Sequence, residues 1–213
     1  MTQLLRLAFY TVFVRLITHI VLGLNVRHRE RLPTKGPCVL VANHNSHLDT
    51  MVLMTLLPTK VLSITHPVAA ADYFLRNRLF AWFATKVVGI LPIRRVVKRG
   101  DPHPLTPCFE ALDAGRILIL FPEGTRGEPE QRSDFKNGIA RLVKDYPNVP
   151  VIPIYLHGLG KALPKGEALL VPFFCDVFVG EPIPWTANRK EYMATLEDRF
   201  EALAKEGRQA LWE

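Results

Sequence analysis

A histidine and an aspartate stand five residues apart in Asn43-His44-Asn45-Ser46-His47-Leu48-Asp49, directly after the apolar run Cys38 to Ala42. On one continuous helix, residues five apart lie about 140° apart around the axis, so these two side chains can meet only where the backbone bends between them. A turn from a strand into a helix supplies that bend. The Asp49 carboxylate would then hold one ring nitrogen of His44 and leave the other to accept a proton. This spacing therefore predicts a general base.

A second polar motif, Phe121-Pro122-Glu123-Gly124-Thr125-Arg126, ends another apolar run, Ile117 to Phe121. Loops that follow the carboxyl ends of strands are where α/β folds usually bind ligands. We therefore expect the two motifs to meet in one cleft.

The elements around these motifs alternate between strands and helices. β-Branched or aromatic content and bounding Pro or Gly predict strands at Cys38 to Ala42, Val61 to Thr65, Gly89 to Ile93, Ile117 to Phe121, Val151 to Leu156 and Leu169 to Val179. Helices are expected at Leu48 to Leu57, Asp72 to Val87, Leu105 to Ala114, Gly138 to Tyr146 and Asn188 to Lys205, the last capped by Thr186 or Asn188. The alternation predicts an α/β fold with a largely parallel central sheet flanked by helices.

Four sequence blocks occur in the order typical of one enzyme family. They are N-H-x4-D at Asn43 to Asp49, Gly-x-x-x-Ile-x-Arg at Gly89 to Arg95, E-G-T-R at Glu123 to Arg126, and the Pro-containing apolar strand Val149 to Pro153. With them, the chain resembles the glycerolipid acyltransferase family, whose best-known members acylate 1-acylglycerol-3-phosphate. The resemblance covers roughly residues 25 to 185. Pro92 and Arg94 depart from it, since the family often has Phe and Asp there.

The resemblance implies transfer of a fatty acyl group from acyl-CoA or acyl carrier protein to the hydroxyl of a lysolipid, with 1-acylglycerol-3-phosphate as the first candidate. His44 and Asp49 would be catalytic, and no metal or bound cofactor is expected. The residues expected to bind substrate are Arg95, Glu123, Gly124, Thr125 and Arg126, with Arg95 and Arg126 at the positions associated with the acceptor phosphate. Lys136 resembles a further basic position of the family.

Composition limits the other possibilities. The 213 residues suffice for one domain with a sizeable core, and three cysteines without a close pair argue against a disulfide framework. The formal net charge of +7 favours an anionic partner, either a phospholipid surface or nucleic acid.

The N-terminal segment favours the lipid surface. Residues 4 to 24 are mostly apolar, but Arg6, Arg15 and His19 interrupt them, and Thr11, Arg15, Thr18 and His19 share an arc of about 100° on a helical wheel. We expect residues 1–24 to form an amphipathic membrane-associated helix and residues 25–213 to form the acyltransferase domain. The protein would then be peripheral or monotopic, on the cytoplasmic face, without a nucleic-acid partner. A core helix and a spanning segment remain the alternatives, and Arg76 to Lys86 is a second candidate membrane contact.

Three rival functions remain open. A lysolipid with another head group could be the acceptor, and a basic membrane-binding module without catalysis would explain the charge but not the paired motifs. His44, His47 and Asp49 could also be imagined as metal ligands, but the sequence offers no convincing fourth ligand.

Overall fold

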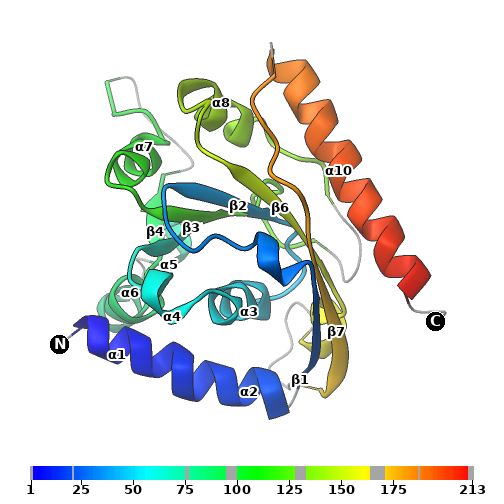
Figure 1. The fold of residues 1–213 in the computed structure, drawn as a ribbon. Coiled ribbons are helices and arrows are strands. Elements are labelled where there is room, and N and C mark those ends of the chain that lie inside the picture. Colours follow the sequence, from blue (N-terminus) through cyan, green and yellow to red (C-terminus); the bar gives the residue numbers. More distant parts are fainter. Residues whose placement is uncertain are drawn as a thin grey trace.

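The protein is represented by a computed structural model that describes residues 2–20, 22–74, 77–94, 100–127, 133–163, 171–186 and 188–210. Its centre is a seven-stranded sheet (Figure 1). The strands are β1 (Leu22–Arg27), β2 (Cys38–Ala42), β3 (Thr65–Ala70), β4 (Leu91–Ile93), β5 (Ile117–Leu120), β6 (Val151–His157) and β7 (Phe173–Val179).

The strand order is β1-β7-β6-β2-β5-β3-β4, and every neighbouring pair is parallel except β6 and β7. β2 lies between β5 and β6 and is buried along its whole length. Its side chains alternate between the two faces, with Leu40 packed in one core cluster and Val39 and Val41 in the other. A buried strand of this kind gives the motif at its carboxyl end a rigid base.

Helices cover both faces of the sheet (Figure 1). The N-terminal helix, α3 (Leu48–Leu56), α4 (Thr59–Leu62) and α9 (Leu159–Ala162) contribute to the cluster on one face. The cluster on the other face is built with α7 (Thr106–Asp113), α8 (Gly138–Asp145) and α10 (Arg189–Ala210). The remaining helical segments are η2 (Arg29–Arg31), α5 (Ala71–Phe74), α6 (Arg78–Trp82) and η3 (Phe83–Val88). The structure thus confirms the predicted α/β class.

Most of the predicted elements occur at or near their predicted positions, and three differ. The helix expected over residues 1–24 ends at Ile20, because β1 begins at Leu22. Val61 to Thr65 is not a strand, because α4 and a turn occupy it and β3 begins only at Thr65. The helix predicted over Asp72 to Val87 is interrupted, since Asn77 caps a new helix by accepting a hydrogen bond from the Leu79 amide at 2.8 Å. Of the two cap candidates for α10, Asn188 accepts from the Glu191 amide at 2.9 Å.

The N-terminal helix consists of α1 (Thr2–Ala8), η1 (Phe9–Val14) and α2 (Arg15–Ile20), and it lies along the domain (Figure 1). Arg6, Tyr10, Val14 and Thr18 are buried beneath it. Its outer side is apolar and exposes Leu4, Leu5, Leu7, Val12, Phe13, Leu16 and Ile20. Of the predicted polar arc, Arg15 is exposed and Thr18 is buried. Within the described part of the chain, we find no helix with the length and apolar character needed to cross a membrane.

Hydrogen bonds from two polar side chains hold this helix against β3, the turn before it, and η3. The Arg6 guanidinium donates to the carbonyl oxygens of Ser63 and Thr65, and the Tyr10 hydroxyl donates to the Val88 carbonyl at 3.0 Å. Gly89 lies directly against the Arg6 guanidinium, where a Cβ atom would collide with it. Residues 2–20 are therefore an integral part of the domain's packing.

Candidate active site

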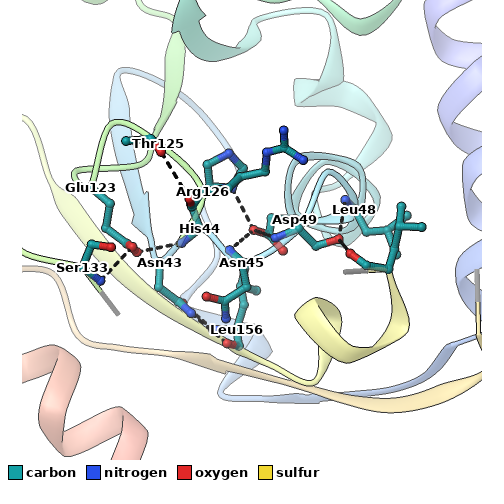
Figure 2. A network of polar contacts seen from close by, with 12 residues as sticks. Asn43, His44, Asn45, Leu48, Asp49, Glu123, Thr125, Arg126, Ser133 and Leu156 are labelled. Atoms are coloured by element: carbon teal, nitrogen blue, oxygen red, sulfur yellow. Dashed lines mark hydrogen bonds and ion pairs between the residues drawn. The ribbon is translucent and has the colours of Figure 1, made fainter. Parts of the chain in front are cut away.

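One oxygen of the Asp49 carboxylate accepts three hydrogen bonds from the turn between β2 and α3. Its Oδ2 atom accepts from His44 Nδ1 at 2.8 Å, from the Asn45 amide at 2.7 Å and from the Ser46 amide at 2.8 Å (Figure 2). The backbone bend between His44 and Asp49 therefore forms as the spacing predicted. It is held by the same carboxylate that orients the imidazole.

The protonation of this pair follows from its surroundings. Complete burial raises the pKa of Asp49, while the hydrogen bonds from His44, Ser46 and Asn45 act against that shift. The N-terminus of α3 also favours a negative charge at this position. An ionised Asp49 requires a proton on His44 Nδ1, which leaves Nε2 as the proton acceptor.

Phe121 packs against the face of the His44 imidazole. The two ring centroids lie 4.1 Å apart with an interplanar angle of 19°. The His44 side chain keeps 19% of its surface exposed, whereas that of Asp49 is fully buried. The ring is therefore restrained by an aromatic face and a carboxylate but remains accessible to a substrate.

Asn43 connects the start of this turn to the neighbouring strand. Its side-chain nitrogen donates to the Leu156 carbonyl at 2.9 Å, and its side-chain oxygen accepts from the Leu156 amide at 2.7 Å (Figure 2). Asn43 is 2% exposed, so this pair of hydrogen bonds replaces backbone pairing at the end of β6. It fixes the position at which the chain leaves β2.

Glu123 joins the two motifs. Its Oε1 atom accepts from the His44 amide at 2.8 Å, and its Oε2 atom accepts from the Ser133 amide at 3.0 Å (Figure 2). Burial raises the pKa of Glu123, and the two amides oppose the shift. Sequence analysis placed Glu123 among the substrate-binding residues. In the structure, both of its carboxylate oxygens instead accept hydrogen bonds from backbone amides.

The rest of the second motif forms a tight turn next to His44. Gly124 has a positive φ of 70°, and a Cβ atom there would lie 2.8 Å from Lys136 Nζ. The Lys136 amino group therefore lies over the backbone of this turn. The Gly127 amide donates to the His44 carbonyl at 3.1 Å, which fixes the chain just after Arg126. Burial lowers the pKa of His47, and the nearby positive charge of Arg126 adds to this shift.

The structure thus brings His44, Asp49, Glu123, Gly124, Thr125 and Arg126 to one end of the parallel strands. Arg95 lies outside the described residues. The sequence did not predict the stacking of Phe121 on His44 or the hydrogen bonds that Glu123 and Asn43 make to the backbone. The sequence shows that Asn43 and Glu123 follow apolar runs. It does not show that their hydrogen-bond partners lie 113 and 79 positions away.

These features describe a domain that holds one histidine–aspartate pair at the end of a central parallel strand. Comparison with known proteins gives the class: the family model described as Acyltransferase matches residues 23–157, and the chain belongs to this family.

Several named proteins resemble the chain. The 1-acyl-sn-glycerol-3-phosphate acyltransferase BAT2, chloroplastic, of Brassica napus is 33% identical over 161 residues, which cover 75% of this chain and 44% of that protein. The corresponding LPAT1 protein of Arabidopsis thaliana is 34% identical over 163 residues, covering 75% of this chain and 43% of its own length. The chain thus spans somewhat under half the length of these relatives.

A solved structure shares the fold. The crystal structure of the 1-acyl-sn-glycerophosphate (LPA) acyltransferase PlsC from Thermotoga maritima superposes with a TM-score of 0.76 at 21% identity. The match covers 93% of this chain and 78% of that one. At this identity the likeness concerns the architecture alone.

Proposed function

We propose that the protein transfers a fatty acyl group from the thioester of coenzyme A or acyl carrier protein to the hydroxyl of a lysolipid, with 1-acylglycerol-3-phosphate as the preferred acceptor. The observation that carries the proposal is the 2.8 Å bond between His44 Nδ1 and Asp49 Oδ2, next to the turn that bears Arg126. The relatives named above as 1-acyl-sn-glycerol-3-phosphate acyltransferases support the choice of acceptor.

The reaction requires two proton transfers, first from the acceptor hydroxyl to the base and then from the base to the leaving sulfur. The acceptor hydroxyl gives its proton to His44 Nε2 as its oxygen attacks the thioester carbonyl carbon. When the tetrahedral intermediate collapses, the carbon–sulfur bond breaks and the leaving sulfur takes that proton from the imidazolium. Asp49 keeps the ring in the required tautomer and stabilises its positive form. The acceptor oxygen is itself the nucleophile, so we propose no serine nucleophile, metal ion or bound cofactor.

The acceptor phosphate would be bound by Arg126. A guanidinium offers two parallel charge-assisted hydrogen bonds that match a phosphomonoester. The Lys136 amino group beside Gly124 adds a second positive charge over the same turn. A phosphomonoester can accept hydrogen bonds from both cations, whereas a neutral head group offers neither of them a negative charge. A phosphate acceptor therefore fits the described site better than the alternative lysolipids.

We also propose that the protein is associated with a membrane surface on the cytoplasmic face, as a peripheral or monotopic protein. The outer side of the N-terminal helix and the exposed residues Leu79, Phe80, Trp82 and Phe83 form what we call the apolar face. The two parts adjoin, since the Phe9 and Phe83 rings meet edge to face at 5.4 Å. Arg15, Arg78 and Lys86 are exposed on the same helices. Apolar residues beside exposed cations suit an anionic lipid surface better than nucleic acid.

The proposal is tested by incubating the purified protein with labelled acyl-CoA or acyl carrier protein and a panel of lysolipids, followed by mass analysis of the products. We expect phosphatidic acid from 1-acylglycerol-3-phosphate and much less product from acceptors with other head groups. Equal use of all head groups would contradict phosphate recognition. A membrane-binding protein that formed no product with any donor would support the alternative of a non-enzymatic module.

A further inference from the structure

Three aromatic side chains connect the candidate active site to the apolar face. Tyr73 and Phe74 belong to α5 and Phe80 belongs to α6. Their rings lie in mutual contact, with centroid distances of 4.9 Å for Tyr73 and Phe74, 5.6 Å for Phe74 and Phe80, and 6.4 Å for Tyr73 and Phe80. We call these three residues the aromatic row.

One end of the row reaches the active site. The Tyr73 ring stacks on His47 at 6.4 Å with an interplanar angle of 29°. His47 is three residues from His44, and the Gly127 amide, next to Arg126 in the sequence, donates to the His44 carbonyl at 3.1 Å. The row therefore begins beside the groups proposed to bind the acceptor phosphate and to activate its hydroxyl.

The other end opens onto the apolar face. Phe80 is 42% exposed and Tyr73 is 44% exposed, while Leu79, next to Phe80, is 81% exposed. The inner side is fixed, because Phe74 packs against the buried cluster of Ala84, Val88 and Ile90. Aromatic rings that are held from behind but uncovered in front present a preformed apolar surface.

We propose that the aromatic row binds the acyl chain of the lysolipid acceptor while its phosphate lies at Arg126 and its hydroxyl at His44. This inference rests on the proposed function. It assigns the row to the acceptor because a lysolipid resides in the bilayer with its chain inward. When the apolar face lies on the membrane, the row forms an apolar connection from that face to the turn that holds His44 and His47.

The proposal predicts how catalytic efficiency depends on acceptor chain length. We would measure kcat/KM for 1-acylglycerol-3-phosphates of increasing chain length, all kept below their micellar concentrations and without vesicles. A chain buried on the row should raise kcat/KM by at most roughly fourfold per methylene, the equivalent of about 0.8 kcal/mol. Tyr73→Ser and Phe80→Ser should each reduce this increment by about half or more.

A matched control is Phe174→Ser, which removes an aromatic ring from β7 that is 82% exposed and lies outside the row. It should leave the increment unchanged. An equal loss of kcat/KM at every chain length in the row variants would mean a structural role and would overturn the proposal. A changed dependence on donor chain length, with the acceptor dependence intact, would overturn it as well.

A second measurement needs no variant. A 1-acylglycerol-3-phosphate with a photoreactive group at the end of its chain should label the segment from Ala71 to Phe83, detected by digestion and mass analysis. Labelling confined to other segments would contradict the proposal. If the parent acylated no acceptor at all, the proposed function would fail, whereas labelling would still test the row.

Discussion

Replacing Glu123 by glutamine tests how the two motifs of the site are held together. Glu123 accepts one backbone hydrogen bond on each oxygen, from the amides of His44 and Ser133. Glutamine keeps only one acceptor oxygen, and its amide group would direct N–H donors at the other backbone N–H. One of the two links must therefore break.

The expected effect follows from the burial of this side chain. Glu123 is 1% exposed, so water cannot replace the lost partner. A hydrogen bond to a charged group contributes about 1.5 to 3 kcal/mol, and we expect the free energy of unfolding to fall by about 2 kcal/mol. If the His44 backbone shifts, kcat should fall by roughly 10- to 100-fold, because a small misplacement of a catalytic group is costly. KM for the acceptor should change little.

Urea unfolding followed by circular dichroism would measure the stability, and steady-state acyl transfer would separate kcat from KM. Glu110→Gln is the matched control, since Glu110 is an exposed glutamate on α7. If Glu123 instead bound the acceptor hydroxyl, the variant would keep the parent's stability and raise KM. That result would refute the positioning role.

Four further outcomes are expected. His44→Ala should lower the rate of acyl transfer by at least about 100-fold with the fold intact, as shown by product analysis and circular dichroism, and near-normal turnover would remove His44 as the base. Arg126→Ala should lower kcat/KM for 1-acylglycerol-3-phosphate relative to that for a neutral acceptor by the equivalent of about 2 kcal/mol, and Arg126→Lys should restore part of the loss. An unchanged ratio of the two kcat/KM values would exclude phosphate binding by Arg126. Phe13→Asp should reduce cosedimentation with anionic vesicles at unchanged stability, and undiminished binding would exclude the apolar face. Burial lowers the pKa of His66 from 6.5 to about 4, so the unfolded chain binds the proton more tightly than the folded one. The free energy of unfolding should therefore fall by up to about 3 kcal/mol as the pH is lowered from 6.5 to 4. This loss should be smaller in His66→Gln, and an equal loss in both proteins would contradict the assignment.

Local chemistry accounts for what the sequence predicted well. β2 and α3 were placed correctly because an apolar run bounded by Pro37 leads into a polar turn, and each signal lies within a few residues of the element it defines. The contact of His44 with Asp49 followed from the same local geometry. These are the parts of the fold in which propensity and tertiary packing agree.

Tertiary pairing decided the elements that the sequence misplaced. Among the described residues, β1 pairs with β7, far along the chain, and its sequence continues an apolar stretch that also suits a helix. β3 contains Pro67, which normally argues against an inner strand, but β4 pairs with it only from Val68 onward. The Glu123 link between two backbone amides has no sequence signal of its own, because any buried acidic residue could be read as a ligand-binding group.

If the protein binds a membrane as proposed, the bilayer is a ligand of the folded state, because hydrogen bonds from Arg6 and Tyr10 hold the N-terminal helix on the domain. The outer surface of this helix exists only while its inner side packs against α3, η3 and β1. A vesicle that binds the apolar face therefore binds the native chain in preference to the unfolded one. Membrane binding and unfolding therefore become linked equilibria. Lipid binding would then also stabilise β3 and β5 against unfolding, because Arg6 donates to the Thr65 carbonyl at the start of β3 and β3 pairs with β5.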